Sequence, residues 1–341
     1  MMAQMKLLII APSVVPLGTG RYGGIEGLCL SFVEQLNKRG HKVSVAAPIG
    51  SKVPDGVNLI ETVKLPEEQD RDDIAYSEMA TTELETFDVI HDFSHGHKLA
   101  RNESNLPTIS MLWDPVVHTY PKAPYNMVCL SNWQKERFEK KYNQKAIVMP
   151  MMVNTDKYKP DPNAKRERFL FLGKISQEKG VHKAIEYAKE LKVPLDVVGG
   201  LIPSEEGSQY LKNIQIMVDR ARYHENHDIQ LYYNVTEDEK IRFLQNAKAV
   251  IYPVQQDEAH WLVGIEAWCC GTPTIASAKG ALPEVTRYGS ITSEEGIRDK
   301  MINMLLWNWN LISDGKETYG HENVIPQWET LYKEVSEGKR W

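Results

Sequence analysis

Two glutamates, Glu258 and Glu266, are spaced so that both could bind hydroxyl groups of one ligand. Seven residues separate them, and the apolar run between them predicts a short helix, which advances about 3.6 residues per turn. The backbone N–H groups of Leu262, Val263 and Gly264 would open this helix, and a helix N-terminus favours a phosphate. Two carboxylates beside such a helix start suit a sugar joined to a diphosphate. The alternative is one glutamate that favours the helix dipole and a second that is solvated.

Two lysines could neutralise that diphosphate. Lys174 and Lys179 flank a loop that the pattern places between a buried strand and a helix. Ammonium groups stabilise the negative charge that develops when a glycosidic bond to phosphate breaks. The alternative is a pair of surface lysines, which is the usual environment of this residue.

A glycine-rich stretch follows the first predicted strand. Residues 18–23 satisfy G-x-G-x-x-G, but the first glycine comes seven residues after the strand end at Ala11, not in a tight turn. The second predicted strand ends in Ala-Ala-Pro at residues 46–48 and offers no acid for a ribose hydroxyl, which argues against dinucleotide binding. We predict instead a loop in which Gly23 and Gly24 let the backbone approach a ligand at a helix N-terminus. A plain turn is the alternative.

Several further segments carry a family resemblance when they are taken in order. They are Tyr22-Gly23-Gly24-Ile25-Glu26, Arg39-Gly40-His41-Lys42-Val43, Asp88-Val89-Ile90-His91, Leu172-Gly173-Lys174 with Gln177-Glu178-Lys179-Gly180, Cys270-Gly271-Thr272-Pro273, and Leu282-Pro283-Glu284-Val285. With the two glutamates, they resemble the retaining GT-B glycosyltransferases of family 4, also called glycosyl transferases group 1, over about residues 6–290. The resemblance implies an α/β fold of two Rossmann-like domains with doubly wound parallel sheets that face a cleft.

The resemblance also implies how a nucleotide-diphosphate sugar would be held. Lys174, Lys179 and the amides of residues 262–264, with Gly173, would hold the diphosphate. Glu266 would bind the ribose hydroxyls and Glu258 the hydroxyls of the sugar. The resemblance implies neither a divalent metal nor a cofactor. It also implies no enzymic nucleophile, because the leaving phosphate helps to deprotonate the acceptor.

Other implied roles concern the base and the catalytic cleft. The base would be read largely by backbone groups near Asn234 and Val235, with a UDP-hexose favoured as donor over GDP-mannose. His91 would line the cleft as a catalytic residue. The acceptor, whether a saccharide, a lipid-linked molecule or a small molecule, is not indicated by the sequence, because acceptor contacts come from variable loops.

Three positions depart from the family pattern. Lys174 stands where the family usually has arginine. An ammonium group lacks the bidentate geometry that a guanidinium group offers to phosphate. Trp113 stands where a histidine near the donor sugar is common, and Asp114 and His118 are the nearby polar substitutes. Trp261 stands where glycine is usual, so we expect it to narrow the sugar pocket and to disfavour an N-acetyl group.

A histidine-rich stretch offers an alternative, metal-dependent chemistry. His91, His95 and His97 lie at a predicted strand end, and Asp88 or Asp92 could complete a metal site. Their spacing matches no standard zinc pattern, so we favour the metal-free interpretation.

The chain of 341 residues suits two domains of about 150 residues each. A net charge of −6 argues against a protein that follows nucleic-acid phosphates. The four cysteines have no metal or redox spacing and lie in apolar segments, which predicts buried free thiols in a reducing cytoplasm. No apolar run is long enough for a membrane span. The basic, aromatic stretch 131–145 is predicted as a solvated helix face, with contact to an anionic membrane surface as the alternative.

Alternating apolar strands and amphipathic helices fill both halves of the chain, as in doubly wound sheets. A polar, proline-containing join near residues 151–168 separates them. We predict an acceptor-side domain over 1–155, a donor domain over 156–318, and a C-terminal helix over 319–341 that crosses back to the first domain. The predicted function is metal-independent, retaining hexosyl transfer. The alternatives are a sugar-nucleotide epimerase or hydrolase on the same scaffold, and a non-catalytic nucleotide-sugar binding protein.

Overall fold

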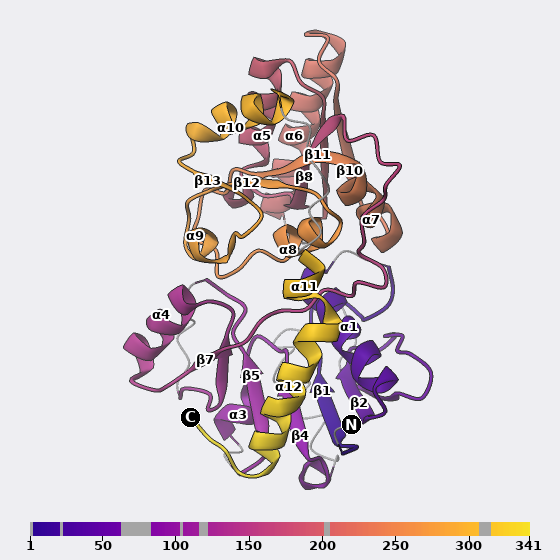
Figure 1. Ribbon diagram of the computed structural model, residues 1–341, viewed down its shortest axis with the longest axis vertical. Helices are drawn as coiled ribbons and strands as arrows, with labels where there is room; N and C mark the ends of the chain where they lie inside the picture. The colour runs from indigo at the N-terminus through magenta and orange to yellow at the C-terminus, as the bar shows by residue number, and fades with distance from the viewer. Residues whose placement is uncertain are drawn as a thin grey trace. The chain divides into compact units, whose positions relative to one another are not determined.

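The computed structural model describes residues 3–20, 23–62, 83–102, 105–115, 122–200, 205–306 and 315–341. The chain divides into two compact units, one formed by residues 1–152 with 321–341 and the other by residues 153–320. Each unit contains one parallel sheet with connecting helices (Figure 1). The predicted α/β class with two parallel sheets is therefore confirmed.

The sheet of the first unit is built from short, buried strands. Those described are β1 (Lys6–Ile10), β2 (Lys42–Ala47), β3 (Asn58–Glu61), β4 (Val89–Asp92), β5 (Thr108–Met111), β6 (Met127–Cys129) and β7 (Ile147–Val148). They pair in parallel in the order β3-β2-β1-β4-β5-β6-β7. Because helices cover a parallel sheet on both faces, its central strands are apolar on both sides.

Of the α-helices described in the first unit, all but the shortest, over residues 98–102, were predicted. The described helices are α1 (Gly24–Lys38), α3 (Lys98–Asn102), α4 (Asn132–Tyr142) and α12 (His321–Ser336). Helix α1 buries Leu28, Phe32 and Leu36 along one face. Helix α4 begins after Ser131, whose hydroxyl oxygen accepts a hydrogen bond from Gln134 N.

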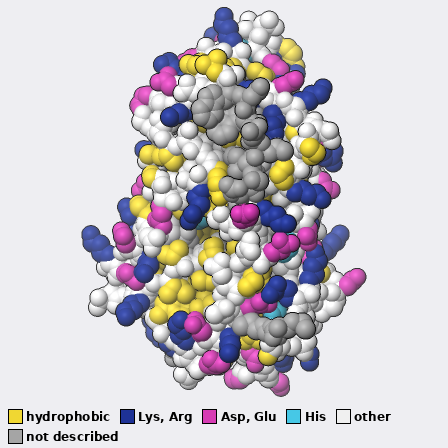
Figure 2. All heavy atoms as spheres, viewed as in Figure 1, with side chains coloured by type: hydrophobic (Ala, Val, Ile, Leu, Met, Phe, Trp, Pro, Cys, Tyr) yellow, Lys and Arg dark blue, Asp and Glu magenta, His cyan; other side chains and the backbone are white. Residues whose placement is uncertain are grey.

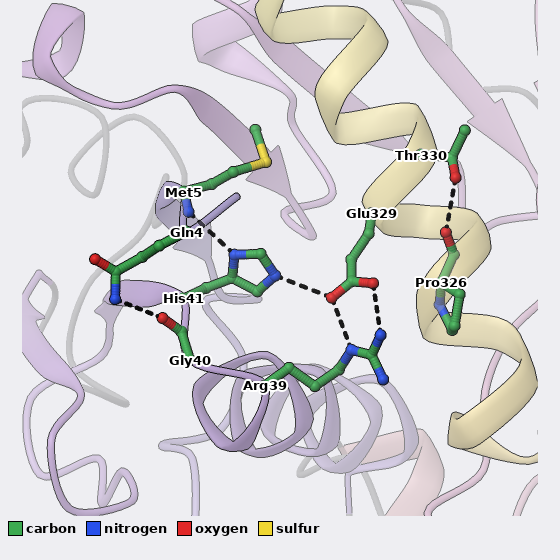
Figure 3. A network of polar contacts seen from close by, with 8 residues as sticks. All are labelled: Gln4, Met5, Arg39, Gly40, His41, Pro326, Glu329 and Thr330. Carbon is green, nitrogen blue, oxygen red and sulfur yellow. Dashed lines mark hydrogen bonds and ion pairs between the residues drawn. The ribbon is translucent and has the colours of Figure 1, made fainter. Parts of the chain in front are cut away.

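Helix α12 packs against α1 and β4 within the first unit (Figure 1). The Trp328 ring meets Phe32 edge-on at 5.5 Å between centroids. Glu329 accepts two hydrogen bonds from Arg39, at 2.7 and 2.8 Å, and lies 3.0 Å from His41 Nε2 (Figure 3). Since His41 Nδ1 accepts a hydrogen bond from Met5 N, Nε2 carries the proton and donates a hydrogen bond to Glu329. The R-G-H segment therefore anchors the C-terminal helix to β1 and α1.

The second unit repeats the alternation of strand and helix. Its described strands are β8 (Arg168–Lys174), β9 (Leu195–Gly200), β10 (Ile229–Tyr233), β11 (Ala247–Tyr252), β12 (Thr274–Ser277) and β13 (Gly289–Thr292), in the parallel order β10-β9-β8-β11-β12-β13. Its described helices are α5 (Val181–Leu191), α6 (Glu205–Tyr223), α7 (Glu237–Asn246), α8 (Leu262–Cys269), α9 (Leu282–Val285), α10 (Gly296–Leu306) and α11 (Gly315–Tyr319). Thr236 and Glu239 form the predicted capping box at the start of α7.

Strands β3, β7 and β13 were not predicted. Each lies at a sheet edge, has two to four residues and is only partly buried, so it lacks the apolar run that marks a central strand. None of the described helices has the length and apolar character to cross a membrane. On the face shown in Figure 2, Lys and Arg side chains are interspersed with Asp and Glu.

Candidate functional site

The loop after β8 is fixed against the loop after β11 by the backbone. Gln255 N donates a hydrogen bond to Glu178 O at 2.8 Å. Gly180 has a φ of +76°, and a β-carbon there would collide with the Pro253 carbonyl. Both the dihedral angle and the close approach therefore require glycine. This contact brings the lysine loop beside the loop that carries the first glutamate.

Lys179 and Glu258, two predicted site residues far apart in sequence, form an ion pair. Lys179 Nζ lies 2.5 Å from Glu258 Oε1, and the two side chains are 20% and 9% exposed. The backbone of Glu258 is held in turn, since its carbonyl accepts a hydrogen bond from Ala281 N at 2.7 Å. Gly280, with a φ of +57°, packs directly against the Glu258 backbone. An ammonium group and a carboxylate are thus side by side at a loop that is held by a backbone hydrogen bond.

Lys174 ends β8 and contacts the same loop. Its Nζ lies 3.0 Å from Glu178 Oε1. Burial raises the pKa of Glu178, but backbone hydrogen bonds and Lys174 outweigh it, so the pKa lies below its usual value. Gly173 precedes Lys174 in the strand, and its carbonyl oxygen lies where a side chain at Gly199 would be.

Helix α8 begins at Leu262, as predicted, and its first turn contains the amides of residues 262–264. Trp261 occupies the N-cap position and gives no side-chain hydrogen bond to this turn. Serine, threonine or aspartate at that position would have satisfied one of these N–H groups. The N-cap side chain therefore does not compete with an external acceptor, such as a phosphate, for these N–H groups.

The expectation that Trp261 narrows a sugar pocket is wrong. Its side chain is 3% exposed and stacks on Tyr252, with the ring planes 11° apart and the centroids separated by 4.8 Å. A β-carbon at Gly264 would collide with the indole ring. Trp261 therefore fills the core of the second unit, and Gly264 provides the space for it.

Glu266 lies on α8 and is only 6% exposed. Its Oε1 is 2.7 Å from Lys240 Nζ on α7. Its buried Oε2 has no hydrogen-bond partner within the part of the chain that the structure describes. The sequence did not identify Lys240. The available signal was the capping box at Thr236, which fixes the start of α7 and hence the face on which Lys240 lies.

Tyr158 is a second residue that the sequence did not identify. Its buried ring lies under Lys240, with Nζ 5.1 Å from the ring centroid. Burial, followed by the charges of Glu266 and Glu237, raises the pKa of Tyr158 well above its usual value. Asn234 and Val235 follow β10, just before α7, and Asn234 is exposed with a φ of +59°.

In the first unit, Gly23 is the N-cap residue of α1 and Gly24 is its first residue. A β-carbon at Gly23 would meet the Glu26 carboxylate, which is the end of a flexible side chain, so the packing does not require glycine there. Burial raises the pKa of Glu26 above its usual value. These glycines lie at a helix start, but their predicted contact with a ligand stays a prediction.

His91 does not fit its expected role as a cleft-lining catalytic residue. It is 1% exposed, its Nδ1 lies 2.8 Å from the Tyr332 hydroxyl, and its ring stacks on Trp328 at 4.7 Å. Burial lowers its pKa to about 3, so the ring is neutral at physiological pH. His91 is a core residue beneath α12.

The other histidines of this stretch contact separate acids. His95 Nδ1 lies 3.7 Å from Asp114 Oδ2, and His97 Nδ1 lies 3.7 Å from Asp92 Oδ2. Across the described ranges, no group of three or more His, Cys, Asp or Glu side chains could hold a metal ion. Trp113 donates a hydrogen bond from Nε1 to Phe93 O at 2.9 Å. His118 lies outside the described residues.

Comparisons with known proteins match a large part of this chain to glycosyltransferases. Residues 153–298 match the family model for glycosyl transferases group 1. A lipopolysaccharide 1,2-N-acetylglucosaminetransferase of Salmonella typhimurium is 24% identical over 61% of this chain and 59% of its own length. An uncharacterized glycosyltransferase of Methanocaldococcus jannaschii is 22% identical over 62% of this chain and 60% of its own length. The chain thus matches about three fifths of the length of these curated relatives.

Solved structures resemble the whole chain. AviGT4, a glycosyltransferase of avilamycin A biosynthesis, has a TM-score of 0.72 at 20% identity and covers 99% of both chains. A sucrose-phosphate synthase from Thermosynechococcus elongatus has a TM-score of 0.78 at 16% identity, over 98% of this chain and 100% of that one. HepE of Anabaena, solved with UDP and glucose, has a TM-score of 0.72 at 15% identity, over 96% of this chain and 99% of that one. These likenesses confirm the predicted GT-B fold.

Proposed function

We propose that this chain, whose residues 153–298 match the family model for glycosyl transferases group 1 and which has the GT-B fold, is a retaining glycosyltransferase that uses a nucleotide-diphosphate sugar. The observation that carries the proposal is that both glutamates around the start of α8 are paired with lysines, Glu258 with Lys179 and Glu266 with Lys240. A sugar diphosphate presents hydroxyl groups beside phosphates. A site for such a ligand therefore combines carboxylates, which accept from the hydroxyl groups, with cations, which neutralise the phosphates. Here the two kinds of group lie within hydrogen-bond distance of each other.

In the proposed mechanism, the second unit stabilises the leaving group. Lys179 and Lys174, with the amides at the start of α8, neutralise the diphosphate as the bond between C1 of the sugar and the phosphate oxygen breaks. The acceptor hydroxyl attacks C1 from the same face, and its proton moves to the departing phosphate. Glu258 accepts hydrogen bonds from the sugar and Glu266 from the ribose. No side chain then has to form a covalent intermediate.

We expect UDP to raise the melting temperature of the protein more than GDP or ADP does. HepE of Anabaena, which shares the fold, was solved with UDP-glucose, and this supports the choice of UDP. A ligand that binds only the native state stabilises it by about 2.7 kcal/mol at a concentration 100 times its Kd. Thermal denaturation with each nucleotide makes the comparison. A larger shift with GDP would overturn the choice of base, and no shift with any of the three would count against the whole proposal.

The transferred group is proposed to be a hexose, and N-acetylated hexoses are no longer disfavoured. The expected discrimination against them relied on Trp261, which lies in the core. A panel of nucleotide sugars, incubated with and without saccharide, lipid-linked and small-molecule acceptors, tests the function itself. Acceptor-dependent release of nucleotide supports transfer. Isomerisation or hydrolysis without acceptor, or binding without turnover, would overturn it.

We expect a chelator to leave turnover unchanged. The charge of the diphosphate is proposed to be neutralised by Lys174, Lys179 and helix amides, so no divalent ion is needed for that step. Initial rates with EDTA, and with EDTA followed by excess Mg²⁺ or Mn²⁺, provide the measurement. Activity that disappears with EDTA and returns with the metal would contradict this prediction and reopen a role for His95 and His97.

A cytoplasmic location is part of the proposal, because all four cysteines are free and buried, as in a reducing compartment.

Helix α4 is the basic, aromatic segment for which contact with a membrane surface was the alternative. The Arg137 guanidinium lies over the Trp133 ring at 3.6 Å, so the protein's own cation covers this aromatic side chain. This arrangement favours a solvated helix face.

A further inference from the structure

Lys240 and Glu266 form a partly desolvated ion pair between two helices. Lys240 Nζ lies 2.7 Å from Glu266 Oε1, and the two side chains are 15% and 7% exposed. Only one carboxylate oxygen is used, since Oε2 is buried without a hydrogen-bond partner in the described chain. A buried acceptor without a partner is costly, which suggests that a ligand supplies the missing donor.

The surroundings of this pair limit how Glu266 can move. The Tyr158 ring lies under the Lys240 ammonium group, and Glu237, on the same helix as Lys240, holds Lys157 Nζ at 3.1 Å. Cys269, the last residue of α8, and Cys270, its C-cap, are neighbouring groups, and burial raises the pKa of both thiols, that of Cys269 to about 12. Lys240 and the Tyr158 hydroxyl group are therefore both beside the Glu266 carboxylate, and Lys240 is the charged one of the two.

We propose that Lys240 is a positioning residue that holds Glu266 so that its second oxygen can accept hydrogen bonds from the ribose hydroxyls of the donor. The inference rests on the proposed function, because it requires a nucleoside diphosphate at this site. Lys240 itself need not touch the nucleotide. Its ammonium group holds the carboxylate in a single orientation, and carboxylate acceptors form the stronger hydrogen bonds.

The competing interpretation is a pair that only stabilises the fold. Lys189 and Glu225 provide a comparison in the same unit, with a similar N–O distance of 2.6 Å. Loss of a structural pair lowers stability but affects ribose and deoxyribose ligands equally. Loss of a positioning pair removes the preference for ribose. The ratio of the two affinities therefore separates the two interpretations.

The experiment measures Kd by titration calorimetry for whichever of UDP, GDP and ADP the wild type binds most tightly, and for its 2′,3′-dideoxy form. The wild type is expected to prefer the ribose form by about 10-fold or more, the size of a hydrogen bond to a charged group. In Lys240→Met this ratio should fall to about 3 or less. Lys240→Arg, which keeps the charge, should restore most of the preference, and Lys189→Met should keep the full ratio.

Each outcome has a separate meaning. If no nucleotide binds the wild type, the proposed function is overturned. If the wild type binds but does not distinguish ribose from dideoxyribose, the role of Glu266 is wrong, and the inference fails with it. If the wild type distinguishes them and Lys240→Met does so equally, the inference alone is overturned. If Lys240→Met does not fold, the ratio of the affinities for the ribose and dideoxy nucleotides is measured instead for Lys240→Gln, which retains an N–H donor.

Discussion

Lys179→Ala is expected to lower kcat/KM by about 10²-fold or more, which is the effect of removing one preorganised electrostatic contact from a transition state. In the proposed mechanism the ammonium group meets the phosphate whose charge increases as the glycosidic bond breaks. The substitution also leaves Glu258 without its cation, so the carboxylate that binds the sugar is no longer held. Both effects act on the transition state.

The same loss is expected for Glu266→Ala, which removes the proposed acceptor for the ribose hydroxyls. Steady-state kinetics with a saturating acceptor provide the measurement, and circular dichroism checks the fold. The lysine loop should survive the loss of the Lys179 side chain, because Gln255 N, Glu178 O and Gly180 hold it through the backbone. Lys189→Ala is the matched control, since it removes an ion pair in the same unit. Near-wild-type kinetics in both site variants would contradict the assignment of Lys179 and Glu266 to the donor site.

The sequence predicted those parts of the site that depend on local backbone signals. The start of α8, the capping box of α7 and the lysine loop ending in Gly180 are each defined by residues close in sequence. Their meeting at one edge of the second sheet follows from parallel topology, in which strand ends and helix starts lie together.

His91 shows where such reasoning fails. It is the penultimate residue of a buried strand, and a residue there can face either a ligand or another helix. Its actual neighbours, Trp328 and Tyr332, lie on a helix more than 230 residues further along the chain. No local pattern around His91 contains that information. Its burial could be predicted only by knowing where α12 packs.

Trp261 and Gly264 show a related difficulty. Each was interpreted separately, the tryptophan as an obstruction in the pocket and the glycine as a backbone donor. The structure couples them, since the indole occupies the space that a side chain at position 264 would need. Lys240 was missed for the same reason, because its partner Glu266 is 26 residues away on another helix.

Glu329→Gln is expected to destabilise the first unit by about 2–4 kcal/mol, because Glu329 accepts charge-assisted hydrogen bonds from both Arg39 and His41 and is buried. This loss of stability is smaller than that expected for a fully buried pair, because the Arg39 side chain is 40% exposed. Denaturant unfolding monitored by tryptophan fluorescence measures the loss. Glu334→Gln, on the same helix, removes only an exposed pair with Lys339 and should cost less than about 1 kcal/mol.

The pH dependence of that loss provides the sharper test. Burial raises the pKa of Glu329, but Arg39 and His41 outweigh it and hold it below the usual value of 4.5. A carboxyl whose pKa is depressed on folding contributes stability above its unfolded pKa and loses it as the pH falls through the folded pKa. The difference between wild type and Glu329→Gln should therefore be full at neutral pH and shrink in acid below about pH 4.5. Nucleotide affinity should stay unchanged, because the residues proposed to hold the diphosphate and the ribose, Lys174, Lys179 and Glu266, lie in the other unit. A stability difference that persists in strong acid, or one no larger than that of Glu334→Gln, would mean that packing of Trp328 and Tyr332, rather than the ion pairs, anchors α12.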